Sequence, residues 1–562
     1  MASGVPVGDW RDHVVPFPAG EVKRFRELGL WSGRTIGEEF HAMAASAGDR
    51  VAVVDPRGRL TYSELDRRST SIAAGLLELG LAVGDRVVFQ TSNRVETVEA
   101  WYGVLKAGLV PVCGLPIHGR HEIDALVKST GARAHLIDAE ARDGQVLNLA
   151  LGVKARSQSV RHVVTIGGPA GAGDACIAVL ADADPDLGRL EAVDASLRPD
   201  DLALLQLSGG TTAAPKAIPR LHAESWYNAL ATAQRYPILA EERVAHVIPI
   251  VHNAGLHSAL HAAHSVGATL LVCGPDPDEF IPFLLREQVD SVLLVPGIVS
   301  WLLKREDFRE LLGRLRRLSL SASAVPVELF EQLEDMGVVA VQQFGMGEGF
   351  CTGTPLDAPR SMRRDTVGYP LSKDDEFLVV DPDGHEVSEG QYGELWVRGP
   401  YTIRGYWNAA ERNAEAFTPS GFYKTGDVVQ WREVDGRRCV VVGGRIKDLI
   451  NRGGEKINAE EVESALLRHP AVREAALVAM PDPRLGERAC AYLVTESPEA
   501  MPTLADLTAL LGGMGLAKYK WPERLEFIDV LPRTPIGKVE KASLRERVAL
   551  QITREELADA SS

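Results

Sequence analysis

Cysteine is scarce in this chain of 562 residues, which has six, spread from Cys113 to Cys490. None forms a CxxC pair or stands at metal-ligand spacing from a histidine, so we expect reduced, buried thiols rather than a zinc site or a disulfide framework. Long apolar runs are also absent, since none approaches the ~20 residues that a membrane-spanning helix needs. The opening MASGVPVGDWRDH lacks the pattern of a signal peptide. The sequence therefore predicts a cytoplasmic protein without a membrane partner.

Positive charge is in deficit too, because 61 Lys and Arg residues stand against 77 Asp and Glu residues, a formal net charge of −16. This balance repels nucleic-acid phosphates unless a local basic patch overrides it, so we expect no nucleic-acid partner. With 45% hydrophobic and 25% charged residues, the rest of the composition is ordinary for a soluble globular protein. Collagen-like, coiled-coil and wholly disordered classes are therefore excluded.

Short β-branched strands alternate with helical stretches between residues 35 and 188, and the same order continues to about residue 341. This alternation predicts an α/β fold with mostly parallel sheets, arranged as two α/β subdomains. After residue 368, Gly-rich short strands with DG turns predict a β-rich subdomain. A helix at 458–467 and a strand at 475–478 indicate a small α+β C-terminal domain. We predict a large N-terminal core at 1–446 and a mobile C-terminal domain at 447–562.

An apolar strand at 202–207 runs directly into a loop of small and hydroxylated residues. Small residues let backbone N–H groups approach a phosphate, and hydroxyls and a lysine supply further donors and positive charge. The residues that carry this prediction are Ser208, Gly209, Gly210, Thr211, Thr212 and Lys216. The loop is not a Walker A motif, because Pro215 precedes the lysine and Ala217 follows it. The alternative, when this loop is considered alone, is that it forms only a flexible turn.

Four further unusual segments follow in order: QFGMGEG at 343–349, YKTGD at 423–427, GRIKDLINRGGEKI at 444–457, and PRTPIGKVEK at 532–541. Together with the phosphate loop they resemble the motifs of the adenylate-forming superfamily, which includes acyl-CoA synthetases, luciferases and peptide-synthetase adenylation domains. The resemblance covers nearly the whole chain. It implies an enzyme that joins a carboxylic acid to AMP from ATP, releases pyrophosphate and then passes the acyl group to a thiol.

The resemblance also assigns nucleotide-binding roles. The 208–216 loop would hold the β- and γ-phosphates, and Glu348 would bind the Mg²⁺ that bridges them. Asp427 would accept hydrogen bonds from both ribose hydroxyls. The predicted nucleotide contacts outside the loop are Gly345, Met346, Asp427 and Arg445. ATP and Mg²⁺ are therefore the expected cofactors, since two reacting anions must be neutralised and held in line. The alternatives are a solvated loop carboxylate for Glu348 and a turn-forming role for Asp427.

The same resemblance predicts two catalytic residues and a moving domain. Lys538 would reach the carboxylate and the α-phosphate in the first half-reaction, and His252 is the second predicted catalytic residue. Asp448 would be the hinge about which the C-terminal domain swings. After rotation, a second loop would border a tunnel for a pantetheine thiol; its predicted residues are Gly453, Gly454 and Lys456. The alternative for Lys538 is an exposed surface lysine. The alternatives for the other segments are a charged strand end at Arg445 to Asp448 and a structural turn at 451–457.

The segment VIPIVHNAGLHSALH at 247–261 predicts the acid. Adenylation domains for α-amino acids carry an aspartate near this point, whereas this chain has Asn253, whose neutral amide cannot pair with an ammonium group. An amide can donate to and accept from a phenolic hydroxyl. The pair His252–Asn253 resembles that of stand-alone 2,3-dihydroxybenzoate and salicylate AMP ligases of siderophore pathways. The alternative is that Asn253 caps a helix beginning at Ala254.

Two departures from that branch concern the shape of the pocket. Ala254 stands where those relatives usually carry an aromatic ring, and Ser321 and Ala322 stand where they usually have two glycines. The predicted substrate contacts are Asn253, Ala254, Ser258, Ser321 and Gly347. A methyl group in place of a ring frees space that the substrate must fill. This indicates a hydroxyaryl acid of different shape, such as a hydroxyquinaldate or a hydroxypicolinate.

The expected thiol donor is the phosphopantetheine arm of a separate aryl carrier protein, because no carrier domain of ~80 residues follows the Lys538 loop. An aryl-CoA ligase is the alternative within the enzyme class. A catalytically silent binding subunit is the alternative outside it. Retention of Glu348, Asp427 and Lys538 argues against a silent subunit.

Overall fold

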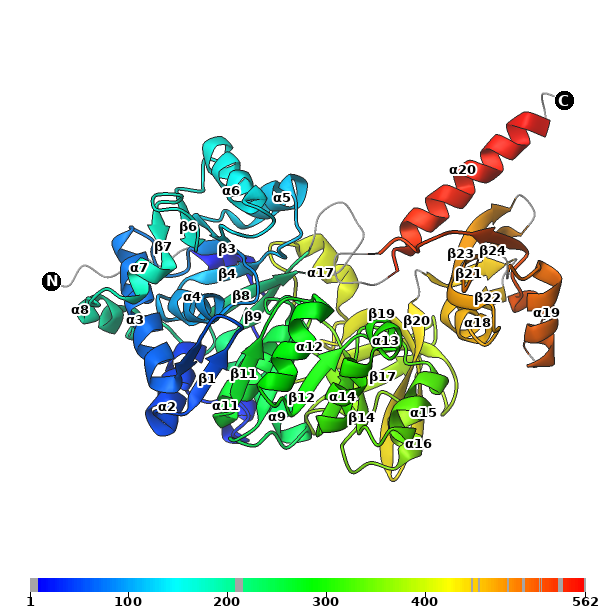
Figure 1. Cartoon of the computed structure of the whole chain (residues 1–562), viewed down its shortest axis with the longest axis horizontal. Coiled ribbons are helices and arrows are strands. Elements are labelled where there is room, and N and C mark those ends of the chain that lie inside the picture. Colours follow the sequence, from blue (N-terminus) through cyan, green and yellow to red (C-terminus); the bar gives the residue numbers. More distant parts are fainter. Residues whose placement is uncertain are drawn as a thin grey trace. The chain divides into compact units, whose positions relative to one another are not determined.

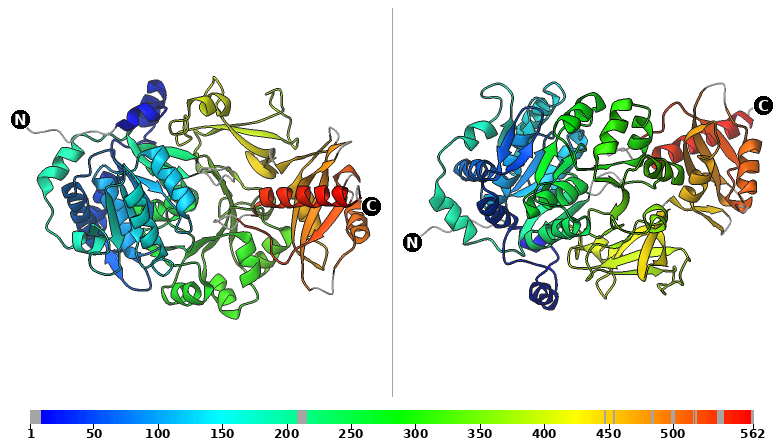
Figure 2. Two further views of the ribbon diagram at one scale, coloured as in Figure 1. Left: turned by 90° about the horizontal axis from the view of Figure 1, so that it is seen from above. Right: turned by 60° about the horizontal axis from the view of Figure 1, so that its bottom comes forward.

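Two α/β sheets make up most of the first part of the chain in the computed structural model (Figures 1 and 2). The structure describes residues 9–207, 216–445, 448–452, 455–482, 485–497, 501–514, 516, 518–533 and 539–559. The chain divides into two compact units, residues 1–376 with 397–423 and residues 377–396 with 424–562. The predicted boundary between 446 and 447 stays a prediction.

The first sheet of the first unit has seven strands in the order β7-β6-β5-β3-β4-β8-β9. They are β3 (Arg86–Gln90), β4 (Val110–Cys113), β5 (Ala134–Asp138), β6 (His162–Ile166), β7 (Ala175–Cys176), β8 (Leu202–Leu207) and β9 (Ala217–Leu221). All neighbours pair in parallel except β8 and β9, which are antiparallel. The mostly parallel sheet predicted from the alternation is thus present.

The second sheet has nine strands in the order β16-β15-β14-β13-β12-β10-β11-β1-β2. They are β1 (Val51–Val54), β2 (Arg59–Thr61), β10 (Arg243–His246), β11 (Thr269–Val272), β12 (Ser291–Leu294), β13 (Arg317–Leu320), β14 (Ala340–Gly345), β15 (Cys351–Gly353) and β16 (Tyr369–Pro370). Strands β10 to β14 and β1 are parallel, whereas β2, β15 and β16 add antiparallel edges.

Helices cover both faces of the first sheet, as the views in Figures 1 and 2 show. Val87 and Phe89 of β3 pack in the core with α3 and α4, while Val88 between them packs in the core with α5 and α6. Burial on both faces explains why β3 has an unbroken apolar run at its centre, from Val87 to Phe89. The helices of this unit, apart from those at the site, are α1 (Ala19–Glu27), α2 (Ile36–Ala47), α3 (Tyr62–Glu78), α4 (Val95–Lys106), α5 (Arg120–Thr130), α6 (Gln145–Arg156), α7 (Ile177–Ala181), α8 (Leu187–Asp194), α9 (His222–Arg235), α12 (Pro277–Arg286), α13 (Pro296–Leu302), α14 (Glu306–Arg314), α15 (Val327–Asp335), α16 (Arg360–Asp365) and α17 (Ala410–Ala416).

Local sequence sets where two of these helices begin. Thr35 caps α2 and Thr61 caps α3, each accepting a hydrogen bond from the backbone N–H of a glutamate three residues on. The carboxylates of Glu38 and Glu64 return the bond to the backbone N–H of the capping residue. These two T-x-x-E capping boxes satisfy donors that would otherwise be orphaned at the helix ends.

The second unit contains the predicted β-rich subdomain and the α+β end of the chain. One sheet has the order β17-β18-β19-β20, with β17 (Glu376–Val380), β18 (Gly393–Arg398), β19 (Tyr423–Val434) and β20 (Arg437–Arg445). The other contains β21 (Ile450–Arg452), β22 (Glu455–Ile457), β23 (Val472–Asp482), β24 (Gly486–Thr495) and β25 (Arg524–Phe527). Its helices are α18 (Ala459–Leu466), α19 (Leu504–Gly513) and α20 (Lys541–Asp559).

All six cysteines are free thiols, four of them buried and two, Cys176 and Cys351, half-buried. The expectation of reduced thiols agrees with this, although burial is incomplete at those two positions. Within the described ranges, no helix combines the length and the apolar character that crossing a membrane requires.

Several histidine rings are almost completely buried in the first unit. The fully enclosed rings are those of His135, His222, His246, His257, His261 and His264. Trp101 donates its indole N–H to Nε2 of His261 at 2.9 Å. Nε2 of His264 lies 3.0 Å from the carbonyl oxygen of Ala52 and must donate to it, so its Nδ1 accepts from the Tyr102 hydroxyl. The rings of His261 and His264 each accept a hydrogen bond at one nitrogen, so both are held in their neutral forms.

Replacing one buried histidine should flatten the pH dependence of stability. Burial lowers the pKa of His135 to about 3, whereas an unfolded histidine titrates near ~6.5. Between these values only the unfolded chain takes up the proton, so the free energy of unfolding falls as the pH falls, by about 1.4 kcal/mol per pH unit for each such group. We expect His135→Gln to remove about that slope between pH 6 and pH 4, as measured by equilibrium unfolding in urea.

The matched control is His385→Gln, because the His385 side chain is 80% exposed in the folded protein. An unchanged slope in His135→Gln, or an equal change in the control, would contradict the assignment of the pH dependence to buried rings.

Candidate active site

Asn253 begins α10 (Asn253–Gly255), which continues into the π-helical turn η2 (Leu256–Leu260) and α11 (His261–Val266). The cap of this helix is His252, whose Nδ1 accepts from the backbone N–H of Ala254 at 3.3 Å. The alternative in which Asn253 caps a helix beginning at Ala254 is therefore wrong. Ala254 and Ser258 are half-buried on the same helical stretch.

The side chain of Asn253 is held by a guanidinium that sequence reasoning missed. Nη1 of Arg220, a residue with 0% exposure, donates to Oδ1 of Asn253 at 3.2 Å and to the Gly347 carbonyl at 3.1 Å. Nδ2 of Asn253 donates to the Met346 carbonyl at 3.1 Å. The predicted substrate residues Asn253 and Gly347 and the predicted nucleotide residue Met346 are thus brought together.

A buried carboxylate fixes the guanidinium in turn. Nε and Nη2 of Arg220 donate to the two oxygens of Glu224 at 2.9 and 2.8 Å, a bidentate pair at the start of α9. The spacing of four residues across a helix start was the available sequence signal for this pair. This spacing does not predict the contacts that Arg220 makes with Asn253 and Gly347, which are distant in the sequence.

Behind Asn253, a neutral histidine anchors the helix backbone. Burial, together with the positive charge of Arg220, lowers the pKa of His257 well below its ordinary value. Its Nδ1 lies 3.1 Å from the carbonyl oxygen of Asn253 and must donate to it, so Nε2 accepts from the Ser225 hydroxyl at 2.8 Å. The first turn of the site helix is therefore tied to α9.

The QFGMGEG segment turns between β14 and β15. Gly349 has φ +117°, and a Cβ built there would lie 1.7 Å from the Tyr401 carbonyl oxygen, so only glycine fits. A Cβ at Gly345 would lie 2.7 Å from Sγ of Cys351, and one at Gly347 would lie 2.7 Å from Cδ1 of Ile218. These glycines allow the loop to lie against its neighbours.

Glu348 in this loop is 8% exposed, so the alternative of a solvated carboxylate is wrong. Tyr406 donates its hydroxyl to Oε1 of Glu348 at 2.6 Å. The Tyr423 hydroxyl lies 3.1 Å from the same oxygen and 2.8 Å from the Tyr406 hydroxyl. Burial raises the pKa of both tyrosines, so both stay protonated and able to donate. The ammonium of Lys216 lies 5.0 Å from the centre of the Tyr406 ring.

The chemistry of this carboxylate fits a magnesium ion. Among the described residues, the hydroxyls of Tyr406 and Tyr423 both form hydrogen bonds with Oε1 of Glu348. Oε2 of Glu348 is therefore the atom that would bind the cation. Mg²⁺ is held in nucleotide sites by one or two carboxylates together with phosphate oxygens. The ion would neutralise negative charge on those phosphates.

The predicted residues of the second unit occupy β19, β20 and the segment after them. Asp427 lies within β19, is 4% exposed and is the register partner of Arg445 on β20, so the turn-forming alternative for Asp427 is wrong. Oδ1 of Asp448 accepts from Nη1 of Arg545 on α20 at 2.9 Å. Lys456 lies in β22. The predicted residues that lie outside the described ranges are Ser208, Gly209, Gly210, Thr211, Thr212, Gly453, Gly454 and Lys538.

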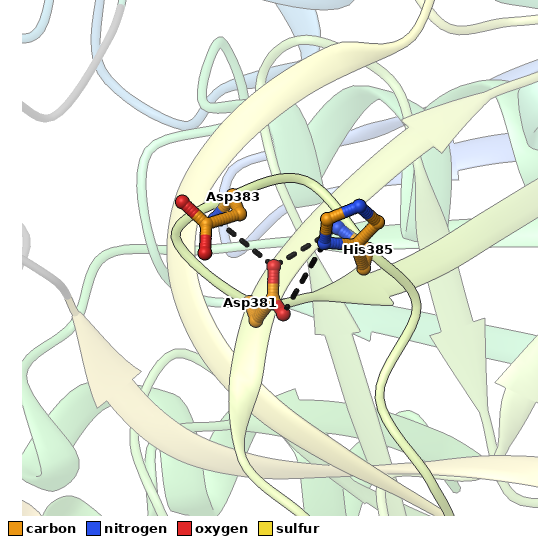
Figure 3. A group of neighbouring side chains, drawn as sticks. All are labelled: Asp381, Asp383 and His385. Atoms are coloured by element: carbon orange, nitrogen blue, oxygen red, sulfur yellow. Dashed lines mark hydrogen bonds and ion pairs between the residues drawn. The ribbon is translucent and has the colours of Figure 1, made fainter.

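Asp381, Asp383 and His385 in the second unit bring three possible metal-ligand atoms within 4.8 Å of one another (Figure 3). Oδ1 of Asp381 accepts from the backbone N–H groups of Asp383 and His385, both at 2.9 Å. This is the ordinary bonding of an aspartate that closes a turn, and two of the three residues are exposed. The cluster is explained by the turn.

Comparison with known proteins shows the family to which the chain belongs. Residues 40–407 match the family described as AMP-binding enzyme, and residues 461–538 match the AMP-binding enzyme C-terminal domain. The chain belongs to the AMP-binding enzyme family. The predicted large N-terminal and small C-terminal domains of an α/β fold are confirmed by the pair of matches.

Two curated relatives match nearly end to end. Pyochelin synthase PchD of Pseudomonas aeruginosa (strain UCBPP-PA14) is 40% identical over 96% of this chain and 97% of its own. The 2,3-dihydroxybenzoate-AMP ligase of Bacillus subtilis (strain 168) is 37% identical over 95% of this chain and 97% of its own. The solved apo structure of Mycobacterium smegmatis MbtA matches with a TM-score of 0.73 and 35% identity, over 96% of this chain and 99% of that one. The predicted resemblance to aryl acid–AMP ligases, and with it an enzyme of the acid–AMP ligase class, is confirmed.

Ser321 and Ala322 follow β13, and both are half-buried. Ala322 has φ +75°, a left-handed conformation that favours glycine and that costs an alanine about 1 kcal/mol. We expect Ala322→Gly to raise the free energy of unfolding by about that amount, as measured by urea or thermal unfolding.

The matched control for this strain is Ala324→Gly in the same loop, since Ala324 is not among the residues with positive φ. Glycine should destabilise the protein there by about 0.5–1 kcal/mol through chain entropy. Equal losses in both variants would show that the Ala322 methyl group contributes packing that outweighs its strain.

Proposed function

We propose that the protein activates a hydroxyaryl carboxylic acid as its acyl-adenylate and then loads it on the phosphopantetheine thiol of a separate carrier protein, in siderophore or nonribosomal peptide biosynthesis. In the first step a carboxylate oxygen of the acid attacks the α-phosphorus of ATP, and pyrophosphate leaves. In the second, the thiol attacks the acyl carbon, and AMP leaves with the oxygen that joined it to the acid. The relative named as a 2,3-dihydroxybenzoate-AMP ligase supports this substrate class.

The observation that carries the proposal is the placement of the neutral Asn253 amide beside the carbonyls of Met346 and Gly347, directly before the buried Glu348. An α-amino acid would bring an ammonium group close to the neutral Asn253 amide and to the positively charged Arg220 guanidinium that is bonded to it. Neither group attracts a cation. An aromatic acid with a polar ortho substituent finds a hydrogen-bond partner there instead.

The described residues supply parts of the predicted charge neutralisation. Lys216 provides an ammonium near Tyr406, and Glu348 is aligned by two phenols to hold Mg²⁺ against the phosphates. In this proposal Lys538 brings a second ammonium to the α-phosphate, Asp427 and Arg445 hold the ribose, and His252 lies beside the acid. Fixed charges of this kind are effective because they need no reorganisation as the pentavalent phosphorus forms.

The shape of the acid is the finer part of the proposal. Ala254 offers only a methyl group on the site helix, and Ser321 and Ala322 add atoms on the strand side. A bicyclic acid such as a hydroxyquinaldate would fill the space beside Ala254 better than a single ring does, and a heteroaromatic acid of single-ring size, such as a hydroxypicolinate, would differ from dihydroxybenzoate in its polar atoms. Free coenzyme A remains the competing acceptor, and comparing thioester formation with a holo-carrier protein and with coenzyme A separates the two.

A panel of acids in the ATP–pyrophosphate exchange assay tests the substrate class. We expect exchange with salicylate, 2,3-dihydroxybenzoate and their bicyclic or heteroaromatic counterparts, with the larger acids giving the higher kcat/KM, and background exchange with amino acids. Dihydroxybenzoate exceeding every larger acid would contradict the pocket shape. Exchange with an α-amino acid alone would contradict the proposed function itself.

Two variants separate the half-reactions. Lys538→Ala should lower adenylation by about 100-fold or more while sparing thioester formation from a supplied acyl-adenylate, because the lysine stabilises charge only in the first step. Gly454→Leu should spare adenylation and block thioester formation, because a side chain there narrows the predicted thiol tunnel. Equal losses in both half-reactions for both variants would contradict the alternation of the C-terminal domain.

A further inference from the structure

The Arg220 guanidinium has no unused donor. It carries five N–H groups, and five hydrogen bonds leave it: two to Glu224, and one each to the Asn253 side chain, the Gly347 carbonyl and Oδ1 of Asn228. The side chain is 0% exposed. Because rotation would leave several buried donors unsatisfied, the guanidinium is fixed in this orientation.

A fixed guanidinium sets which way the Asn253 amide faces. Its Oδ1 accepts from Arg220, and its Nδ2 donates to the Met346 carbonyl. Exchanging the two ends would set the amide N–H groups against guanidinium N–H groups and the amide oxygen against a carbonyl oxygen. Both contacts would then be repulsive, so the observed orientation is the stable one.

This orientation determines what Asn253 offers to a ligand. An amide nitrogen has two N–H groups, and one of them is used by Met346. Among the residues that the structure describes, the second N–H has no acceptor, so it is the donor left for the substrate, while the oxygen is turned toward Arg220. A matching substrate therefore needs a hydrogen-bond acceptor at that point.

We propose that Arg220 is a positioning residue that holds Asn253 as a donor, so that the site selects acids with an acceptor atom ortho to the carboxylate over acids with an ortho amino group. This inference rests on the proposed function. A phenolic hydroxyl ortho to a carboxylate donates its own proton to that carboxylate and leaves its oxygen as an acceptor. A pyridine-type ring nitrogen is an acceptor as well. An ortho amino group donates one N–H to the carboxylate and keeps a second. That second N–H would face the Asn253 N–H, so that two hydrogen-bond donors repel each other.

The unmodified protein gives the first test, with acids of nearly equal size in pyrophosphate exchange. We expect salicylate to exceed anthranilate, and picolinate to exceed benzoate, each by about tenfold or more in kcat/KM. Anthranilate equal to or better than salicylate would overturn the inference and leave the proposed function standing. Exchange with none of the aromatic acids would overturn the proposed function and the inference with it.

The second test asks whether Arg220 is the source of the preference. Arg220→Lys keeps the charge but has three donors instead of five, so the salicylate-to-anthranilate ratio should fall about tenfold toward unity. The matched control is Arg317→Lys: Arg317 is also buried, and it donates to the Tyr236 carbonyl and the Ser291 hydroxyl, away from Asn253. The control should keep the ratio, even if both variants are destabilised equally. A folded Arg220→Lys with the native ratio would overturn the inference.

A double-mutant comparison separates positioning from general damage. If Arg220 acts through the Asn253 amide, Arg220→Lys should change the ratio no further once Asn253 is replaced by alanine. An additional change of the ratio in the Asn253→Ala background would show that Arg220 selects substrates by another route and would overturn the inference. Since the test on the unmodified protein needs no variant, the proposal can be contradicted even where Arg220→Lys fails to fold.

Discussion

The buried pair of Arg220 and Glu224 is the constraint on which the rest of the site depends. Taking two charges out of water is costly unless each is fully hydrogen-bonded. Here the five donors of the guanidinium all find acceptors, and the Glu224 carboxylate also accepts from the backbone N–H of Leu221. The pair therefore links the start of α9 to the site helix and to the loop that carries Glu348.

The nine-stranded sheet explains why the segments that carry His252, Ser321 and Gly347 meet. Strands β10, β13 and β14 are parallel members of one sheet, and the segments with His252, Ser321 and Gly347 follow their carboxyl ends. Parallel strands end at the same edge of a sheet, which is where open α/β sheets bind ligands. A fully enclosed hydrophobic and histidine-rich core behind this edge holds the helices that carry the polar side chains. The proposed acid site is thus built on rigid elements.

The sequence predicted the elements that local pattern controls. Alternating strands and helices predicted the two sheets, the ordered motifs singled out Glu348, and the His252–Asn253 pair singled out Asn253. It could not choose between Asn253 as a helix cap and Asn253 as a ligand, because a short polar side chain suits both roles. The cap is His252, and the Asn253 side chain is held instead by Arg220, 33 residues away in sequence. Tyr406 and Tyr423, which align Glu348, escaped notice for the same reason, since they lie 58 and 75 residues from it.

In the proposed site, a guanidinium with every donor used presents the Asn253 amide to an aromatic acid. A crystal structure with a non-hydrolysable acyl-adenylate mimic of the preferred acid measures this most directly. We expect the ortho acceptor atom of the ring to lie within hydrogen-bond distance of Nδ2 of Asn253, with all five hydrogen bonds of Arg220 retained. A ligand remote from Asn253, or an amide whose oxygen faces the ligand, would contradict it.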